Sequence, residues 1–230
     1  VTLLGFGLLA VIIAIFGMET SEPLGRVALF AVLMTVSKLQ YVPMNVGTLT
    51  MDFGFLYAGV AVLGPVTAIA LKALTTYLTQ IYLLREDKTP VKYMRASFNA
   101  AQFVLSGFLG YGIYKFLRLQ RGQPLWWGLP ELIGVLVYFA ANNFFIELSV
   151  YLHCKKLKEH RLRALFYVAQ AYLISFPFGV MASYLYRTKG FYYAIAVLTT
   201  GLVVSYIYTL YVKLKEKNRE LSALLNSATI

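Results

Sequence analysis

The sequence predicts an all-α fold: a polytopic membrane helix bundle of 6–8 transmembrane segments, followed by a C-terminal juxtamembrane helix. Hydrophobic residues make up 59% of the 230 residues and charged residues only 13%, whereas a soluble domain carries about 25% charged residues. The remaining charge is too sparse to cover a water-facing surface. Aromatic residues, at 16%, favour the same class, because Tyr and Trp collect at membrane interfaces.

A membrane-spanning helix needs about 20 mainly apolar residues. Apolar runs and polar breaks predict eight candidate segments, at residues 2–16, 26–41, 51–63, 65–84, 97–117, 130–152, 164–186 and 191–212. We therefore expect a transmembrane domain over residues 1–212 and a cytoplasmic signalling helix over residues 213–230 that leads to an output domain.

The third and fourth segments could form one helix, but that helix would be about 50 Å long, against about 30 Å for a hydrocarbon core. Gly64 and Pro65 supply a break between them. Glycine tolerates a turn, and proline fits the first turn of a following helix. We therefore predict two segments here.

The net charge of +11 reflects basic residues that lie mostly between apolar segments. With a cytoplasmic C-terminus, the cytoplasmic loops, counted to include Lys38, hold 14 of the 21 Lys and Arg residues, and the outer loops hold 6. The positive-inside rule favours this orientation. The lipid bilayer is the expected partner of these charges, and we expect no nucleic-acid partner because basic and aromatic residues do not alternate on a polar face.

Lys72 lies in the apolar stretch LGPVTAIALKALTTYLTQ, about 10 Å along the helix that begins at Pro65. An ionised side chain near the bilayer centre costs about 2.5–3.5 kcal/mol. Thr75, Thr76 and Thr79 follow at positions i+3, i+4 and i+7 and share its face. We expect this polar stripe to face the bundle interior or a cavity.

Three interpretations of Lys72 stay open. A structural ion pair with Glu147 or Asp52 would fix the register of the helices. Alternatively, the ammonium group faces a water-filled ligand cavity, or it snorkels to an interface.

Five amide side chains also lie within the apolar segments: Asn99, Gln102, Asn142, Asn143 and Gln170. In membranes such amides commonly form interhelical hydrogen bonds of about 0.6–2 kcal/mol each. Packing is therefore the default role of any one of them. Together with the lysine, the threonine stripe and Glu147, they predict a polar ligand pocket between helices.

Catalytic motifs are missing from the sequence. The only histidines, His153 and His160, and the only cysteine, Cys154, show no metal-ligand spacing. We expect no catalytic site, no metal site and no cofactor in these residues.

The C-terminal stretch KLKEKNRELSALLNSATI is polar and helix-prone. Leu214, Leu221, Leu224 and Ala228 are spaced by seven, three and four residues, as in a short coiled-coil seam. This pattern favours a homodimer through the C-terminal helix. A solvated juxtamembrane helix attracted to anionic lipid is the alternative.

Several stretches together resemble the N-terminal membrane region of bacterial cyclic-di-GMP signalling proteins that carry a cytoplasmic HD-GYP or GGDEF domain. They are VALFAVLMTV, NVGTLTMDFGFLYAGVAVLGP, SFNAAQF, YFAANNFF and LKEKNRELSALLNSATI. The resemblance implies a multi-pass sensor in the bacterial cytoplasmic membrane. Any phosphodiesterase or cyclase activity would belong to a domain outside these residues.

The first half also resembles the substrate-capture subunit of energy-coupling-factor vitamin transporters, through the Leu-Gly-Pro helix pair. Here Val32 stands four residues after Ala28, where that family has a second small residue. The sequence thus predicts a sensory or anchoring membrane module. A small-solute binding subunit of a transporter and a purely structural anchor are the alternatives.

Overall fold

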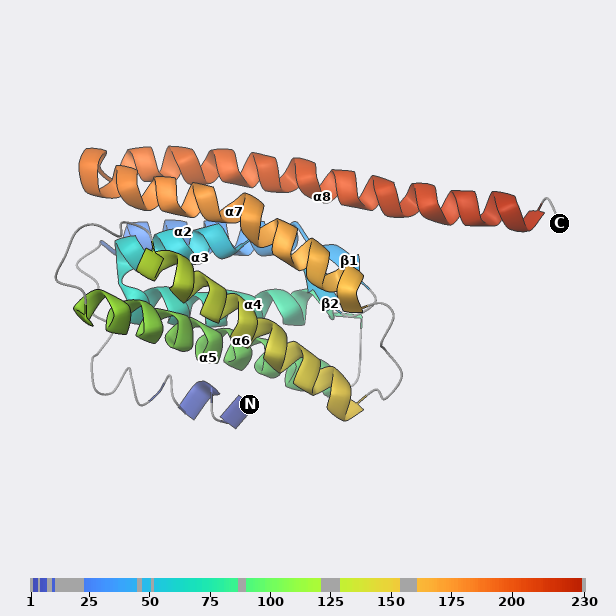
Figure 1. Cartoon of the computed structure of the whole chain (residues 1–230), viewed down its shortest axis with the longest axis horizontal. Helices are drawn as coiled ribbons and strands as arrows, with labels where there is room; N and C mark the ends of the chain where they lie inside the picture. The colour runs from blue at the N-terminus through green and yellow to red at the C-terminus, as the bar shows by residue number, and fades with distance from the viewer. Residues whose placement is uncertain are drawn as a thin grey trace. The chain divides into compact units, whose positions relative to one another are not determined.

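The computed structural model describes residues 2–3, 5–7, 10, 23–44, 47–50, 52–86, 90–120, 129–153 and 161–228. Its long elements are helices, joined by one short hairpin (Figure 1). The helices are α2 (Leu24–Leu39), α3 (Phe53–Leu63), α4 (Pro65–Leu83), α5 (Val91–Gln120), α6 (Leu129–His153), α7 (Arg161–Lys189) and α8 (Phe191–Ala228). The predicted helical class is confirmed, and the predicted first segment, residues 2–16, falls largely outside the described residues.

The hairpin is a departure from the all-α prediction. Strands β1 (Val42–Met44) and β2 (Gly47–Leu49) pair antiparallel, with Val42 opposite Leu49. Each strand has only three residues, so neither shows enough of a two-residue alternation to be recognised in the sequence.

The chain divides into two compact units. The first contains residues 1–35 and 59–161, and the second contains residues 36–58 and 162–230. Helices α2 and α3 each contribute residues to both units.

In the first unit, α5 packs against both α4 and α6 (Figure 1). The contact with α6 is close: a Cβ atom on Gly110 would lie 2.7 Å from the backbone oxygen of Gly134. Toward α4, a Cβ atom on Gly107 would lie 3.0 Å from the side chain of Ile69. Small residues at these positions let the helix backbones approach each other.

In the second unit, α3 crosses α7 at another pair of glycines. A Cβ atom on Gly54 would overlap the backbone oxygen of Ser175, and one on Gly179 would lie 2.7 Å from the backbone oxygen of Gly54. Beside this crossing, the rings of Phe53 and Tyr172 stack with their centres 4.7 Å apart.

Helices α7 and α8 run side by side in the second unit (Figure 1), with Tyr167, Ala171 and Val212 buried between them. The hairpin end of this unit also contacts α8, where Thr209 Oγ1 donates a hydrogen bond of 3.3 Å to the backbone oxygen of Gln40.

The predicted break at Gly64–Pro65 is confirmed. Helix α3 ends at Leu63, α4 begins at Pro65, and Gly64 adopts φ 83°. That left-handed backbone conformation is open to glycine at little cost. The two segments are therefore separate helices.

Three helical stretches among the described residues are long and apolar enough to cross a membrane: Leu129–Ser149, Leu165–Lys189 and Phe191–Ser222. Helix α3 is apolar but shorter. The predicted last segment and tail form one continuous helix, because α8 runs without interruption from Phe191 to Ala228.

We expect Gly110→Ala to lower the free energy of unfolding by about 1–3 kcal/mol, because the added methyl group overpacks the contact between α5 and α6. Gly112→Ala is the matched control on the same helix, since a Cβ atom there meets nothing within 4 Å. The control should stabilise by up to about 1 kcal/mol through helix propensity. Thermal unfolding in detergent measures both changes, and equal effects would contradict the close approach.

Candidate functional site

Helix α4 has a polar stripe, formed by the buried residues Lys72, Thr75, Thr76 and Thr79. Thr67 is buried too, but it lies about 140° around the helix from Lys72. On the face opposite the stripe, Leu74 and Leu78 are 53% and 55% exposed. The prediction that the polar stripe faces the interior is therefore confirmed, whereas its role as a ligand site stays a prediction.

Lys72 is 1% exposed, and its ammonium nitrogen lies 4.9 Å from the centre of the Phe103 ring on α5. A cation this close to an aromatic face is attracted to the ring quadrupole. Because α4 and α5 are antiparallel neighbours with Ile69 beside Gly107, the same register brings Thr76 level with Asn99. The lysine, the threonines and the first amide thus share the interface between two helices.

The second group of amides lies where α5 meets α6. Gln102 Nε2 donates to Asn142 Oδ1 at 2.7 Å and to the Asn142 backbone oxygen at 3.0 Å. Both residues are buried, so this is the interhelical bond expected of amides in apolar segments. Asn143 instead donates to the Phe139 backbone oxygen of its own helix at 2.7 Å.

Five buried polar atoms in the first unit form no hydrogen bond within the described parts of the chain. They are Thr67 Oγ1, Thr76 Oγ1, Thr79 Oγ1, Gln102 Oε1 and Ser106 Oγ. All five lie on α4 or α5. Most buried polar groups in proteins have partners, and each one left without a partner costs about 1–3 kcal/mol. Thr76 and Thr79 share the face of Lys72, whereas Thr67 lies 12 residues, about 18 Å, from Thr79 along α4. The hydroxyls of Thr76 and Thr79 beside the buried Lys72 therefore mark the candidate site.

Glu147 does not complete this site. It is exposed on α6 and forms no ion pair with Lys72. The predicted Lys72–Glu147 pair is therefore wrong, because the rotation of α6 about its axis turns Asn142 inward and Glu147 outward.

Asp52, the other candidate partner, pairs with Lys38 in the second unit. Lys38 Nζ lies 3.5 Å from Asp52 Oδ2, and both side chains are almost fully buried. Thr50 Oγ1 donates a further bond of 3.0 Å to Asp52 Oδ1. Sequence reasoning assigned Lys38 to a cytoplasmic loop, which is wrong, because α2 extends to Leu39 and buries this residue in its last turn.

Gln170 belongs to the second unit, where its Oε1 accepts a 3.1 Å hydrogen bond from the Tyr208 hydroxyl of α8. A second polar contact joins the same helices further along. Glu216 Oε1 lies 3.3 Å from the Tyr167 hydroxyl and 3.0 Å from Arg219 Nη1. Gln170 is therefore a contact between α7 and α8, and the structure does not group it with the amides of α5 and α6.

Comparisons with protein-family models, with curated proteins and with solved structures found no match to this chain. Cys154 and His160 lie outside the described residues. The chemistry of the candidate site is that of a buried ammonium group with neighbouring hydroxyls and amides, which suits hydrogen bonding to a small polar molecule.

We expect Gln102→Leu and Asn142→Leu to be coupled in a double-mutant cycle by about 0.6–2 kcal/mol, the range for hydrogen bonds between membrane helices. Asn143→Leu is the matched control, because its amide bonds within its own helix. Its effect should add to that of Gln102→Leu within about 0.5 kcal/mol. Stability in detergent is the measurement, and coupling to Asn143 in place of Asn142 would contradict the assignment.

We expect Asp52→Asn to destabilise the protein by about 3–5 kcal/mol, because it removes the negative charge that lies 3.5 Å from the buried Lys38 ammonium nitrogen. Glu147→Gln makes the same chemical change at an exposed position and should alter stability by about 0.5 kcal/mol or less. Unfolding in detergent compares the two. A large loss from Glu147→Gln would restore the rejected pairing with Lys72.

Proposed function

We propose that this chain is the membrane-embedded sensory module of a bacterial signal-transduction protein. The polar core of α4, α5 and α6 binds a small polar ligand, and α8 transmits the resulting change to a cytoplasmic output domain. The single observation that carries the proposal is the pair of buried hydroxyls beside Lys72, those of Thr76 and Thr79, which have no hydrogen-bond partner among the described residues.

A hydrocarbon environment would explain why large apolar side chains are exposed on the outer surface of the helices. Within the window of α6 that is apolar enough to span a membrane, only 17% of the residues are buried. Large apolar side chains there are exposed, including Leu136 at 55% and Phe144 at 60%. Exposed apolar patches of this extent are rare on soluble monomers. The bilayer is therefore the proposed medium.

The lower bound of the proposed 6–8 spans, six, adds α2, α4 and α5 to the three apolar helices. Helix α4 has 19 residues, which at 1.5 Å per residue reach about 28 Å and match a hydrocarbon core. It is less apolar than a typical spanning helix because it contains Lys72 and several threonines. These residues are tolerated because they lie on its buried face, out of contact with lipid.

The unsatisfied atoms favour binding over a purely structural role. A polar cluster retained only for packing lowers its free energy when its members pair with one another, as Gln102 and Asn142 do. The hydroxyls of Thr76 and Thr79, on the face of Lys72, form no such bonds within the described parts of the chain. A ligand that supplies partners to them would stabilise the conformation it binds, and so shift a two-state equilibrium.

Helix α8 supplies the route of transmission. Its 38 residues extend about 57 Å, well beyond a hydrocarbon core of about 30 Å. Leu214 and Leu221 in its last part are 62% and 57% exposed and seven residues apart. That spacing supports the proposed homodimer through the C-terminal helix.

The basic residues of the tail support a cytoplasmic C-terminus in the bacterial inner membrane. Without Lys38, the cytoplasmic side still holds more Lys and Arg residues than the outer side. These basic residues lie in the connections around residues 85–95 and 155–163 and in the tail. The same polar core would also suit a solute-capture subunit of a transporter. The long continuous α8 favours the sensor.

We expect alanine insertions after Ser222 to change output periodically when the whole chain is fused at Ile230 to a dimeric cyclase or kinase domain. Each inserted alanine rotates the output domain by about 100°. Activity should therefore rise and fall over seven successive insert lengths. Enzyme activity of the fusion in membranes is the measurement.

Inserts of the same lengths made of glycine and serine are the control, because they interrupt the helix and should give one activity level at every length. Thr76→Val in the uninterrupted fusion should shift basal activity, because it changes the polar core without changing side-chain size. If activity changes neither with insert length nor with Thr76→Val, the sensory role is rejected, and a structural anchor or a transport subunit is favoured.

A further inference from the structure

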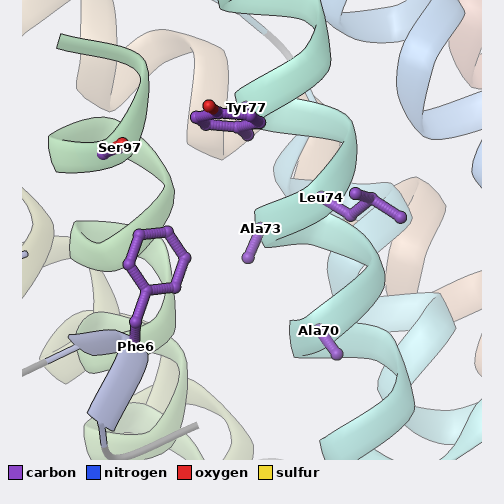
Figure 2. A pocket seen from close by; sticks show the side chains of 6 residues that line it. All are labelled: Phe6, Ala70, Ala73, Leu74, Tyr77 and Ser97. Atoms are coloured by element: carbon purple, nitrogen blue, oxygen red, sulfur yellow. The ribbon is translucent and has the colours of Figure 1, made fainter. Parts of the chain in front are cut away.

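A groove of about 380 Å³ lies on the first unit, outside the polar core. Four of its six lining residues come from α4, namely Ala70, Ala73, Leu74 and Tyr77. Ser97 of α5 and Phe6 of the N-terminal segment complete it (Figure 2). This volume falls within the range of about 300–1,000 Å³ that is typical of ligand sites.

The groove lies on the face of α4 opposite the polar stripe. At about 100° per residue, the centre of its four α4 residues is about 150° around the helix from Lys72. Leu74 is 53% exposed and Phe6 is 37% exposed, whereas Ala73 is 3% exposed. The groove thus has a small-residue floor, which a longer side chain would fill, and an open rim that faces the surroundings of the helix.

Phe6 forms one wall of the groove. A Cβ atom on the preceding residue, Gly5, would lie 2.6 Å from both the Cβ atom and the backbone oxygen of Ala101. Gly5 therefore lies directly against the backbone of α5, one turn from Ser97. In Figure 2 the Phe6 ring projects toward the space between α5 and α4, opposite Ala73.

The groove is amphiphilic along its length. Tyr77 lies six residues before the end of α4, and Ser97 lies six residues after the start of α5. Both hydroxyls are thus about 9 Å from the connection between these antiparallel helices. Ala70 lies about 10 Å further from that connection, where the lining is apolar. The polar end faces the connection and the apolar end faces the middle of the helices.

Positive charge marks the same end. Arg85 lies in the turn that follows α4, two residues after the helix ends at Leu83. Its guanidinium group lies 5.0 Å from the centre of the Tyr82 ring. Lys92 and Arg95 lie on the first turns of α5, and Glu86 is the acidic residue among the described positions here. Basic residues next to a membrane attract anionic headgroups.

We infer that this groove binds one acyl chain of an anionic phospholipid, whose phosphate group lies near Arg85 at the connection between α4 and α5. The open rim lets a chain enter sideways from the bilayer. The small floor residues accommodate a slender apolar chain, and the two hydroxyls meet the ester region. The site is separate from the polar core and does not depend on the ligand proposed there.

The test measures lipid binding to the purified whole chain by native mass spectrometry. The probes are phosphatidylglycerol and phosphatidylcholine with identical acyl chains. We expect phosphatidylglycerol to bind about tenfold more tightly. Ala73→Phe, which fills the groove, should weaken its binding by about tenfold or more. Leu78→Phe is the matched control, one turn away on the exposed face, and should leave binding unchanged.

Arg85→Gln should remove the preference for phosphatidylglycerol and retain binding of phosphatidylcholine. Equal binding of the two lipids by the unmodified protein would contradict the proposed selectivity for an anionic headgroup. Unchanged binding by a folded Ala73→Phe variant would contradict the proposal that the acyl chain lies in this groove.

A second measurement needs no variant. Phosphatidylglycerol with a photoreactive group in its acyl chain should label the peptide that contains Ala70, Leu74 and Tyr77 several-fold above the exposed faces of α6 and α8. Uniform labelling of all apolar helices would overturn the site.

Discussion

The polar stripe of α4 imposes the main constraint on the first unit. A lysine and several threonines on one face of an apolar helix are costly in hydrocarbon, so that face must lie against other protein. Helix α5 supplies the cover: Phe103 lies beside the Lys72 ammonium group, and the close contact at Gly107 brings the two backbones together. Helix α6 packs against a neighbouring face of α5, through Gln102 and Gly110.

In the proposed bilayer, association of helices cannot rely on the hydrophobic effect, since lipid tails are as apolar as the side chains. The contacts within each unit are of the kinds that work without it. Glycines permit close crossings, at Gly110 with Gly134 and at Gly54 with Gly179. Directional polar contacts add to these crossings: the amide pair of α5 and α6 in the first unit, and the buried ion pair of Lys38 and Asp52 in the second.

In the proposed sensor, the two faces of α4 bind different kinds of molecule. The inner face holds polar groups for a ligand, and the outer face, with the N-terminal segment, forms an apolar groove for a lipid chain. One rigid helix therefore separates the two environments by about half a turn. In the second unit, the contacts of Gln170 with Tyr208 and of Tyr167 with Glu216 tie α7 to α8. These contacts tie α7 directly to the helix that we propose carries the signal.

The sequence by itself determined the helical class, the break at Gly64–Pro65 and the inward orientation of Lys72, because these depend on local backbone chemistry and on the period of a single helix. Only the tertiary structure decided the partners. It selected Asn142 and not Asn143 for Gln102, turned Glu147 outward, and joined Lys38 to Asp52 beside a hairpin too short to recognise. Those outcomes depend on how far each helix rotates and slides against its neighbours, which no single segment encodes.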